Sequence, residues 1–140
     1  LSKRKIGALI TIERKVGLGA FIEMGTQLNA EVTSNLIVSI FWPGTPLHDG
    51  AIIISQGKIA SAGCIFPISE TLAVDGNLGT RHRAGIGITE ETDAVAIIVS
   101  EQTGNVSIAV KGRLMKNLDE NTLKSKLGLL MAEADKNKNE

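Results

Sequence analysis

The stretch from Gly50 to Ile65, GAIIISQGKIASAGCI, decides the fold class of this chain. Two runs rich in isoleucine and small residues, Gly50–Ser55 and Lys58–Ile65, are separated only by Gln56-Gly57. A two-residue connection that contains glycine favours a tight turn with positive φ, because that turn matches the twist of paired strands. We therefore predict an antiparallel hairpin near the middle of the chain.

Strands and helices are mixed on both sides of this hairpin. Further strands are predicted at Ile6–Glu13, Ala94–Glu101 and Val106–Lys111. Helices are predicted at Ala30–Trp42, Thr80–Glu91 and Glu120–Ala134. The intervening segments are predicted as a bend at Val16–Ala20, an irregular stretch at Pro67–Gly79 and a turn at Gln102–Asn105. This pattern predicts one α/β domain, with a mixed central β-sheet flanked by helices.

The predicted helix limits rest on local signals. Thr33 or Ser34 can cap the first helix, and Pro43-Gly44 ends it, since proline removes a donor and glycine tolerates the turn. Its apolar stripe consists of Leu36, Ile37, Ile40 and Phe41. The apolar face of the last helix consists of Leu123, Leu127, Leu130 and Met131. We expect residues 1–134 to form the domain and residues 135–140 to be a disordered polar tail.

Composition excludes several classes of protein. The chain has 140 residues, 15 basic and 15 acidic, and no tyrosine, so neither a basic groove nor a base-stacking platform for nucleic acid is expected. The lone Cys64 cannot form an internal disulfide and is expected to be a small buried residue. No run approaches the roughly 20 apolar residues that span a bilayer.

The segment from Thr45 to Ala51, TPLHDGA, lies between a predicted helix and a predicted strand. His48 and Asp49 are adjacent polar residues in this loop, and Gly50 and Ala51 leave the backbone open to a ligand. A plain turn with the aspartate in Asx geometry is the alternative explanation.

The segment from Leu78 to Ala84, LGTRHRA, places Arg81, His82 and Arg83 at the start of a predicted helix. The helix dipole disfavours cations there, so the arginines require an anion such as a phosphate. Thr80 would either cap the helix or add a hydroxyl to the phosphate site. The alternative is a solvated basic helix start that pairs with Glu90 or Glu91.

Two further signals are weaker. Gly85 and Gly87 inside a helix indicate close packing against another backbone or a ligand, or else a shorter helix. Ser100-Glu101 ends a buried strand, where ligands of open α/β sheets bind, and Glu101 could contact a metal or a ribose. A strand that simply leaves the core explains the same pattern.

Taken together, TPLHDGA and LGTRHRA resemble the motifs of the diadenylate cyclase (DAC) family. Gly7–Ile10 (GALI) and Val99–Glu101 (VSE) also match, and the matches run from about Ile6 to Val110. The resemblance implies the DAC-domain fold and the condensation of two ATP into cyclic di-AMP with release of two pyrophosphates. Two alternatives stay open: a regulatory module that binds ATP or a cyclic dinucleotide without turnover, and a structural adaptor domain.

The resemblance also implies residue roles. Asp49 would bind a catalytic divalent metal (Mg²⁺, Mn²⁺ or Co²⁺) and activate the ribose 3′-hydroxyl, with His48 as an additional metal ligand. The catalytic residues would be Asp49, Arg81, His82 and Arg83. The ATP-binding residues would be Leu9, Ile10, Gly50, Ala51, Ile65, Phe66, Gly79, Thr80, Arg81, Ser100 and Glu101. Ile65 departs from the family, in which an aromatic residue near this position often stacks on adenine.

The product of this reaction has two-fold symmetry, whereas the chain has no internal repeat and one apparent nucleotide site. We therefore expect a homodimer that places two sites face to face. The lead-in Leu1–Arg14 and the length resemble the membrane-anchored branch of the family. That branch implies transmembrane helices upstream and a catalytic domain at the cytoplasmic face of the membrane. Regulatory protein partners are compatible with the sequence, which does not identify them.

Overall fold

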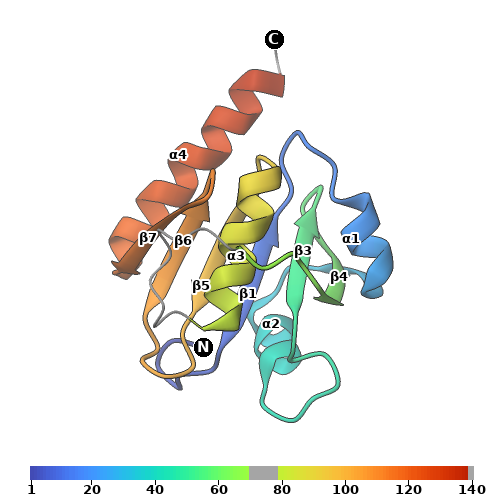
Figure 1. Ribbon diagram of the computed structural model, residues 1–140, viewed down its shortest axis with the longest axis vertical. Helices are drawn as coiled ribbons and strands as arrows, with labels where there is room; N and C mark the ends of the chain where they lie inside the picture. Colours follow the sequence, from blue (N-terminus) through green and yellow to red (C-terminus); the bar gives the residue numbers. More distant parts are fainter. Residues whose placement is uncertain (70–78, 139–140) are drawn as a thin grey trace.

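The computed structural model describes residues 1–69 and 79–138, which form a seven-stranded mixed sheet with helices on both faces (Figure 1). The strands are β1 (Ala8–Ile12), β2 (Thr26–Glu31), β3 (Ala51–Ser55), β4 (Lys58–Cys64), β5 (Val95–Val99), β6 (Val106–Val110) and β7 (Arg113–Leu118). The helices are α1 (Gly19–Met24), α2 (Ser34–Phe41), α3 (Thr80–Glu91) and α4 (Glu120–Lys138). The predicted α/β fold class is confirmed.

The strand order is β2-β4-β3-β1-β5-β6-β7, and β1 lies at its centre. β1 pairs in parallel with β3, with Ile10 opposite Ile52, and antiparallel with β5, with Ala8 opposite Val99. All other described neighbours are antiparallel. The first residues of β1 and β3 and the last residues of β4, β5 and β7 therefore meet at one end of the sheet.

The two faces of the sheet are covered by different helices. α3 and α1 cover one face, where Leu9, Ile88 and Ile98 belong to a buried cluster. α2 covers the other face through its predicted stripe, in which Ile40 and Phe41 are almost fully buried. The predicted amphipathic face of α2 is confirmed, and Cys64 is buried in the first cluster as predicted.

The predicted hairpin is confirmed, with Gln56 and Gly57 both at positive φ (51° and 77°). The same kind of turn at Lys111 (φ 53°) and Gly112 (φ 76°) joins β6 to β7, a strand that the sequence analysis missed. Its sequence RLMKNL mixes polar and apolar residues, and none of its side chains is fully buried at this edge of the sheet. Gly112 in this two-residue turn is the sequence feature from which the second hairpin could have been predicted.

The predicted helix Ala30–Trp42 starts too early, because Ala30 and Glu31 belong to β2 and pair with β4. α2 begins at Ser34, and the hydroxyl of Thr33 accepts a hydrogen bond from the backbone N–H of Leu36 at 3.1 Å. Thr33 is thus the capping residue, one of the two predicted alternatives. The backbone groups of β2 form hydrogen bonds with β4. Local helix propensity does not take such long-range pairing into account.

Other helix limits also differ from prediction. The last two residues of the predicted bend Val16–Ala20 belong to α1, and α4 continues past the predicted end at Ala134 to Lys138. α4 projects beyond the end of the sheet in Figure 1, and the guanidinium of Arg14 donates to the backbone carbonyl of Leu130. No helix in residues 1–69 and 79–138 is long and apolar enough to cross a bilayer.

α3 has the predicted bounds, and its two glycines explain its position close to the sheet. A Cβ at Gly85 would lie 3.0 Å from Cδ1 of Ile98. A Cβ at Gly87 would overlap the backbone carbonyl oxygen of Pro67. The alternative of a shorter helix is therefore wrong, and close packing against neighbouring chain is the reason for both glycines. Most of the predicted irregular stretch Pro67–Gly79 lies outside the described residues.

Candidate active site

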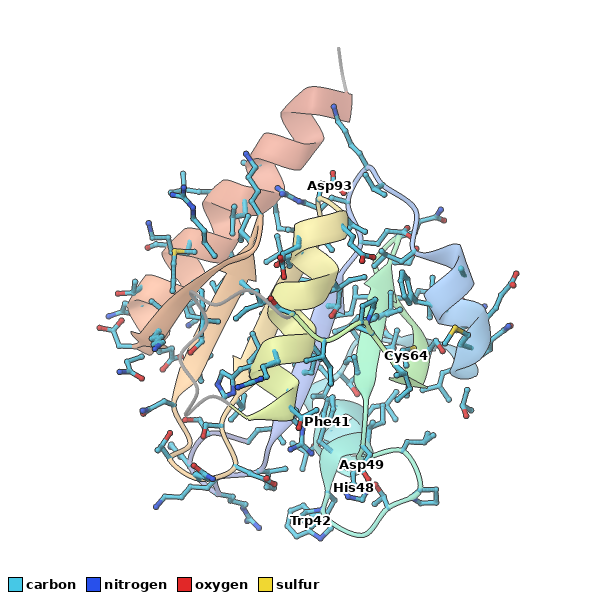
Figure 2. All side chains as sticks on the ribbon, in the orientation of Figure 1. Phe41, Trp42, His48, Asp49, Cys64 and Asp93 are labelled. Atoms are coloured by element: carbon cyan, nitrogen blue, oxygen red, sulfur yellow. The ribbon has the colours of Figure 1, made fainter. Side chains whose placement is uncertain are left out.

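A pocket of about 720 Å³ opens at the end of the sheet where β1 and β3 begin and β4 and β5 end. Figure 2 shows His48 and Asp49 at this end, in the loop that leads into β3, and Asp93 at the opposite end. The volume lies within the range of small-molecule and cofactor sites. The fold thus gathers several separate sequence segments around one cavity.

Most of the predicted site residues line this pocket. They are Leu9, His48, Asp49, Gly50, Ile65, Phe66, Gly79, Thr80, Arg81, His82, Ser100 and Glu101. Three predicted residues do not line it. Ile10 packs on the α2 face, because successive strand residues point to opposite faces, and Ala51 is fully buried. Arg83 contributes its backbone carbonyl to a hydrogen bond from the N–H of Ser69.

His48 and Asp49 place an imidazole nitrogen and a carboxylate oxygen side by side, as potential metal ligands. Nδ1 of His48 is 2.6 Å from the carbonyl oxygen of Thr45, so this nitrogen carries the proton and donates it. In the neutral imidazole the lone pair is then on Nε2, which lies 3.4 Å from Oδ1 of Asp49. The Asp49 side chain is 85% exposed, which leaves its carboxylate open to the pocket.

Divalent metals prefer such donors, and a backbone carbonyl that fixes the histidine tautomer is a common supporting contact. The described part of the chain holds no group of three or more His, Cys, Asp or Glu able to bind a metal. A metal at His48 and Asp49 would therefore complete its coordination with substrate oxygens and water. The donor set fits a metal that binds together with a phosphate-bearing substrate.

Gly50 and Ala51 have a structural role in addition to the one expected from the sequence. Gly50 has φ +95°, and a Cβ there would lie 2.8 Å from the carbonyl oxygen of Cys64. The missing side chain at Gly50 thus makes room for the backbone of β4. Ala51 is likewise packed inside the core. These two small residues set the position of the His48-Asp49 loop against the sheet.

Arg81 connects three parts of the pocket wall. Its Nη1 is 3.4 Å from Oε2 of Glu101, and its Nη2 donates to the carbonyl oxygen of His48 at 3.5 Å. The guanidinium passes directly over Gly7, where a Cβ would lie 2.6 Å from Nη1. Arg81 therefore pairs with Glu101, and the alternative of pairing with Glu90 or Glu91 is wrong for this residue.

The first turn of α3 is open at the pocket. Gly79, not Thr80, is the N-cap residue, and no described side chain caps this end. Thr80 is the first helical residue and lines the pocket, so the prediction that it caps the helix is wrong, while its hydroxyl stays available to a ligand. The uncapped N–H groups and the helix dipole together favour an anion here.

His82 is half-buried next to this helix start. Burial lowers the pKa of its imidazole, and the nearby positive charges of Lys116 and Arg81 lower it further. The side chain is therefore neutral near pH 7 in the folded protein and would gain its proton more readily once an anion binds.

The other side of the pocket is apolar. Leu9 belongs to the α3-side cluster, and Ile65 and Ile68 line the pocket with 61% and 49% of their surface exposed. Phe66 is almost fully buried, and its ring packs edge-on against Phe21 with the centroids 5.3 Å apart. A flat apolar ligand would thus meet Ile65 and Ile68 rather than an open aromatic face.

Several lining residues were missed by the sequence analysis, among them Lys5, Gly7, Lys116 and Asn117. Gly7 lies inside one of the quoted motifs, but its contact with Arg81 depends on the pairing of β1 with β5. Lys116 and Asn117 lie on the unpredicted strand β7. The turn at Gly112 could have been used to predict that strand.

Comparison with known proteins places this geometry in context. The family model described as DisA bacterial checkpoint controller nucleotide-binding (DAC) matches residues 1–114. The chain is 53% identical over 137 residues to the cyclic di-AMP synthase CdaA of Bacillus subtilis, covering 98% of this chain and 49% of that protein. It is 47% identical over 123 residues to a diadenylate cyclase of Listeria monocytogenes, covering 88% and 45%. The chain spans about half the length of these curated relatives.

Solved structures show the same architecture. A crystal structure of a double mutant of DacA from Staphylococcus aureus has a TM-score of 0.89 at 41% identity, covering 95% of this chain and 86% of that one. A Bacillus cereus protein described as a hypothetical membrane-spanning protein has a TM-score of 0.81 at 50% identity, covering 85% and 58%. The resemblance noted from the sequence motifs therefore extends to the whole domain.

Proposed function

Because this chain belongs to the DAC family, we propose that it is a diadenylate cyclase that condenses two ATP into cyclic di-AMP and releases two pyrophosphates. One observation carries the proposal: a single pocket joins the start of α3, which no side chain of the described residues caps, with the Arg81–Glu101 pair and the exposed Asp49 carboxylate. These groups are what adenylyl transfer needs, namely phosphate binding, charge neutralisation and a site for a divalent metal.

The pocket supports one orientation of ATP. The adenine would lie against Leu9, Ile65 and Ile68, the apolar side. The triphosphate would lie at the α3 start, where Thr80, Arg81 and His82 line the wall, with Ser100 and Glu101 on the adjacent β5 end. In this orientation the nucleotide has no contact with Ile10, Ala51 or Arg83, since none of them lines the pocket.

A divalent metal (Mg²⁺, Mn²⁺ or Co²⁺) would be held by Asp49 and His48 and, when bound, would supply positive charge beside the α-phosphate. Asp49 orients the 3′-hydroxyl and accepts its hydrogen bond, and Arg81 neutralises charge that develops on the phosphate oxygens. A bond forms between the 3′-oxygen of one ATP and the α-phosphorus of the other. The bond to the β-phosphate oxygen breaks, pyrophosphate leaves, and the hydroxyl proton passes to solvent. A second transfer of the same kind closes the ring.

A homodimer completes the proposed reaction. The product contains two identical halves, and each chain offers one such pocket, so two chains must present their nucleotides to each other across a two-fold axis. Specific activity should then fall when the protein is diluted below its dimer dissociation constant. A specific activity that stays constant down to nanomolar protein would contradict the dimer.

We also propose a cellular setting for this domain. The relatives include a protein described as membrane-spanning, and the sequence resembles the membrane-anchored branch, so residues 1–134 would act as a catalytic domain at the cytoplasmic face of the membrane. Regulatory proteins that bind the domain would fit this setting, and no nucleic-acid partner is proposed. Residues 135–140 are not needed for the proposed chemistry.

The test of this function is incubation of the purified chain with ATP and Mg²⁺ or Mn²⁺, followed by chromatography of nucleotides and a pyrophosphate assay. Cyclic di-AMP with two pyrophosphates per product is the expected result. Tight ATP binding with no cyclic product would favour a regulatory module without turnover. Failure of ATP at millimolar concentration to raise the melting temperature would favour an adaptor domain.

A further inference from the structure

β7 carries an irregularity where it borders the pocket. Val106 and Ile108, two residues apart on β6, lie opposite Leu118 and Met115, three residues apart on β7. One extra residue is therefore inserted in β7, and Asn117 takes up the left-handed conformation with φ 56°. Such bulges often re-aim side chains next to active sites, and a residue other than glycine at positive φ carries a conformational cost.

The bulge places both of its residues in the pocket wall. In a regular strand Lys116 and Asn117 would point to opposite faces of the sheet. Here both line the pocket, together with Ser107 of β6, the residue between the two shifted pairs. Lys116 follows Leu114 on the α3 face by ordinary alternation, and the irregularity adds the side chain of Asn117 beside it.

Lys116 lines the same pocket as two other basic residues, Arg81 and His82. Arg81 donates a hydrogen bond to the backbone carbonyl of His48. His82, the next residue of α3, also lines the pocket. Lys116 is close enough to His82 to depress the imidazole pKa more strongly than Arg81 does. The positive charges of Arg81 on α3 and Lys116 on β7 therefore both lie near His82, and Lys116 is on the side away from the residues assigned to the metal.

We propose that Lys116, next to the β7 bulge in the pocket wall, binds the β- and γ-phosphates of ATP and hence the pyrophosphate that leaves. The inference rests on the proposed function, since it takes the reacting α-phosphate to lie near Asp49. The remaining phosphates then extend along Arg81 and His82 toward β7. Lys116 lies beyond residues 1–114, the part of the chain that matches the family model. An ammonium group is well suited to phosphate as a point charge.

The test compares nucleotides that differ only in the β- and γ-phosphates. Dissociation constants of ATP and AMP, each with Mg²⁺, are measured by calorimetry for the wild type and for Lys116→Met, which keeps the length of the side chain and removes its charge. We expect ATP to bind about 10–100-fold more weakly, as for loss of one charged hydrogen bond, with AMP affinity unchanged. Lys116→Arg should restore most of the ATP affinity.

Two further variants separate binding from folding. Lys58→Met, an exposed lysine on β4 outside the pocket, is the matched control and should change neither dissociation constant. Asn117→Val keeps the lysine but disfavours the positive φ of the residue next to it, so the displaced backbone should shift Lys116 and lower ATP affinity selectively. Melting temperatures without nucleotide report whether each variant is folded.

The outcomes separate this inference from the proposed function. Unchanged ATP affinity in folded Lys116→Met, or equal losses for ATP and AMP, would overturn the assignment of Lys116 while leaving the cyclase proposal intact. A wild-type protein that binds neither nucleotide would contradict the proposed function itself.

Discussion

The substitution Gly7→Ala should weaken ATP binding although it replaces no residue that contacts the nucleotide in the proposed orientation. Gly7 lies at the start of β1, directly under the Arg81 guanidinium. A Cβ there would lie 2.6 Å from Nη1 and 2.9 Å from Cζ of Arg81, and 3.0 Å from Cβ of Glu101. Contacts this short are not tolerated, so the flexible arginine must leave its position.

The cost to folding can be estimated from the contacts that change. The Arg81–Glu101 pair is 3.4 Å long and Glu101 is 68% exposed, so its loss costs less than about 1 kcal/mol. Overpacking a site of this kind costs about 1–3 kcal/mol. For a domain of this size each kcal/mol lowers the melting temperature by about 2–4 °C. We therefore expect Gly7→Ala to be folded and to melt about 3–10 °C lower.

Gly7→Ala should also lower the affinity for ATP, separately from its effect on stability. A displaced guanidinium forfeits a charged hydrogen bond to phosphate, about 1.5–3 kcal/mol, which corresponds to roughly 10–100-fold weaker ATP binding. Calorimetric titration with ATP and thermal unfolding without ATP measure the two effects separately. Gly17→Ala is the matched control, because a Cβ at Gly17 meets no described atom within 4 Å. A folded Gly7→Ala protein with wild-type ATP affinity would refute the claim that this glycine positions Arg81.

Three further predictions follow from the same geometry. Asp49→Asn should abolish cyclic di-AMP formation while ATP affinity in calorimetry stays within about threefold, and full activity would refute the assigned role. Gly87→Ala should cost about 3 kcal/mol or more in urea unfolding, since its Cβ would overlap the carbonyl of Pro67, whereas Gly128→Ala, in open space on α4, should be neutral or stabilising. The lowered pKa of His82 means that the unfolded chain binds more protons than the folded one just below pH 6.5. The free energy of unfolding should therefore fall as the pH drops from 7 through 6, and His82→Gln should flatten this profile; an unchanged slope in the variant would contradict it.

The parts of the fold that the sequence predicts are those with strong local signals. The Gln56-Gly57 turn identifies its hairpin because positive φ at both residues favours a glycine there. The bounds of α3 were predicted from Thr80 at its start, which is the first helical residue, with Gly79 as the N-cap. β2 and β7 escaped detection because they are edge strands with largely exposed side chains, and their stability comes from pairing with β4 and β6.

The site shows the same division between local and long-range information. The motifs that contain Asp49 and Arg81 were recognisable as sequence, and the fold brings both to one pocket. The contact of Arg81 with Gly7 and Glu101 depends on the antiparallel pairing of β1 with β5, which no local pattern encodes. The role of Lys116 depends on the pairing of β7 with β6, and strand register is set by tertiary packing.

The central claim, that this pocket joins two ATP molecules, is tested most directly with isotope-labelled substrate. The purified protein is incubated with Mg²⁺ or Mn²⁺ and an equal mixture of ordinary and fully ¹³C-labelled ATP, and the nucleotides are analysed by mass spectrometry. We predict light, mixed and heavy cyclic di-AMP in binomial proportion, with the mixed product most abundant and none formed by Asp49→Asn. Only unlabelled cyclic di-AMP carried through purification, or no cyclic product from protein that binds ATP, would contradict the claim.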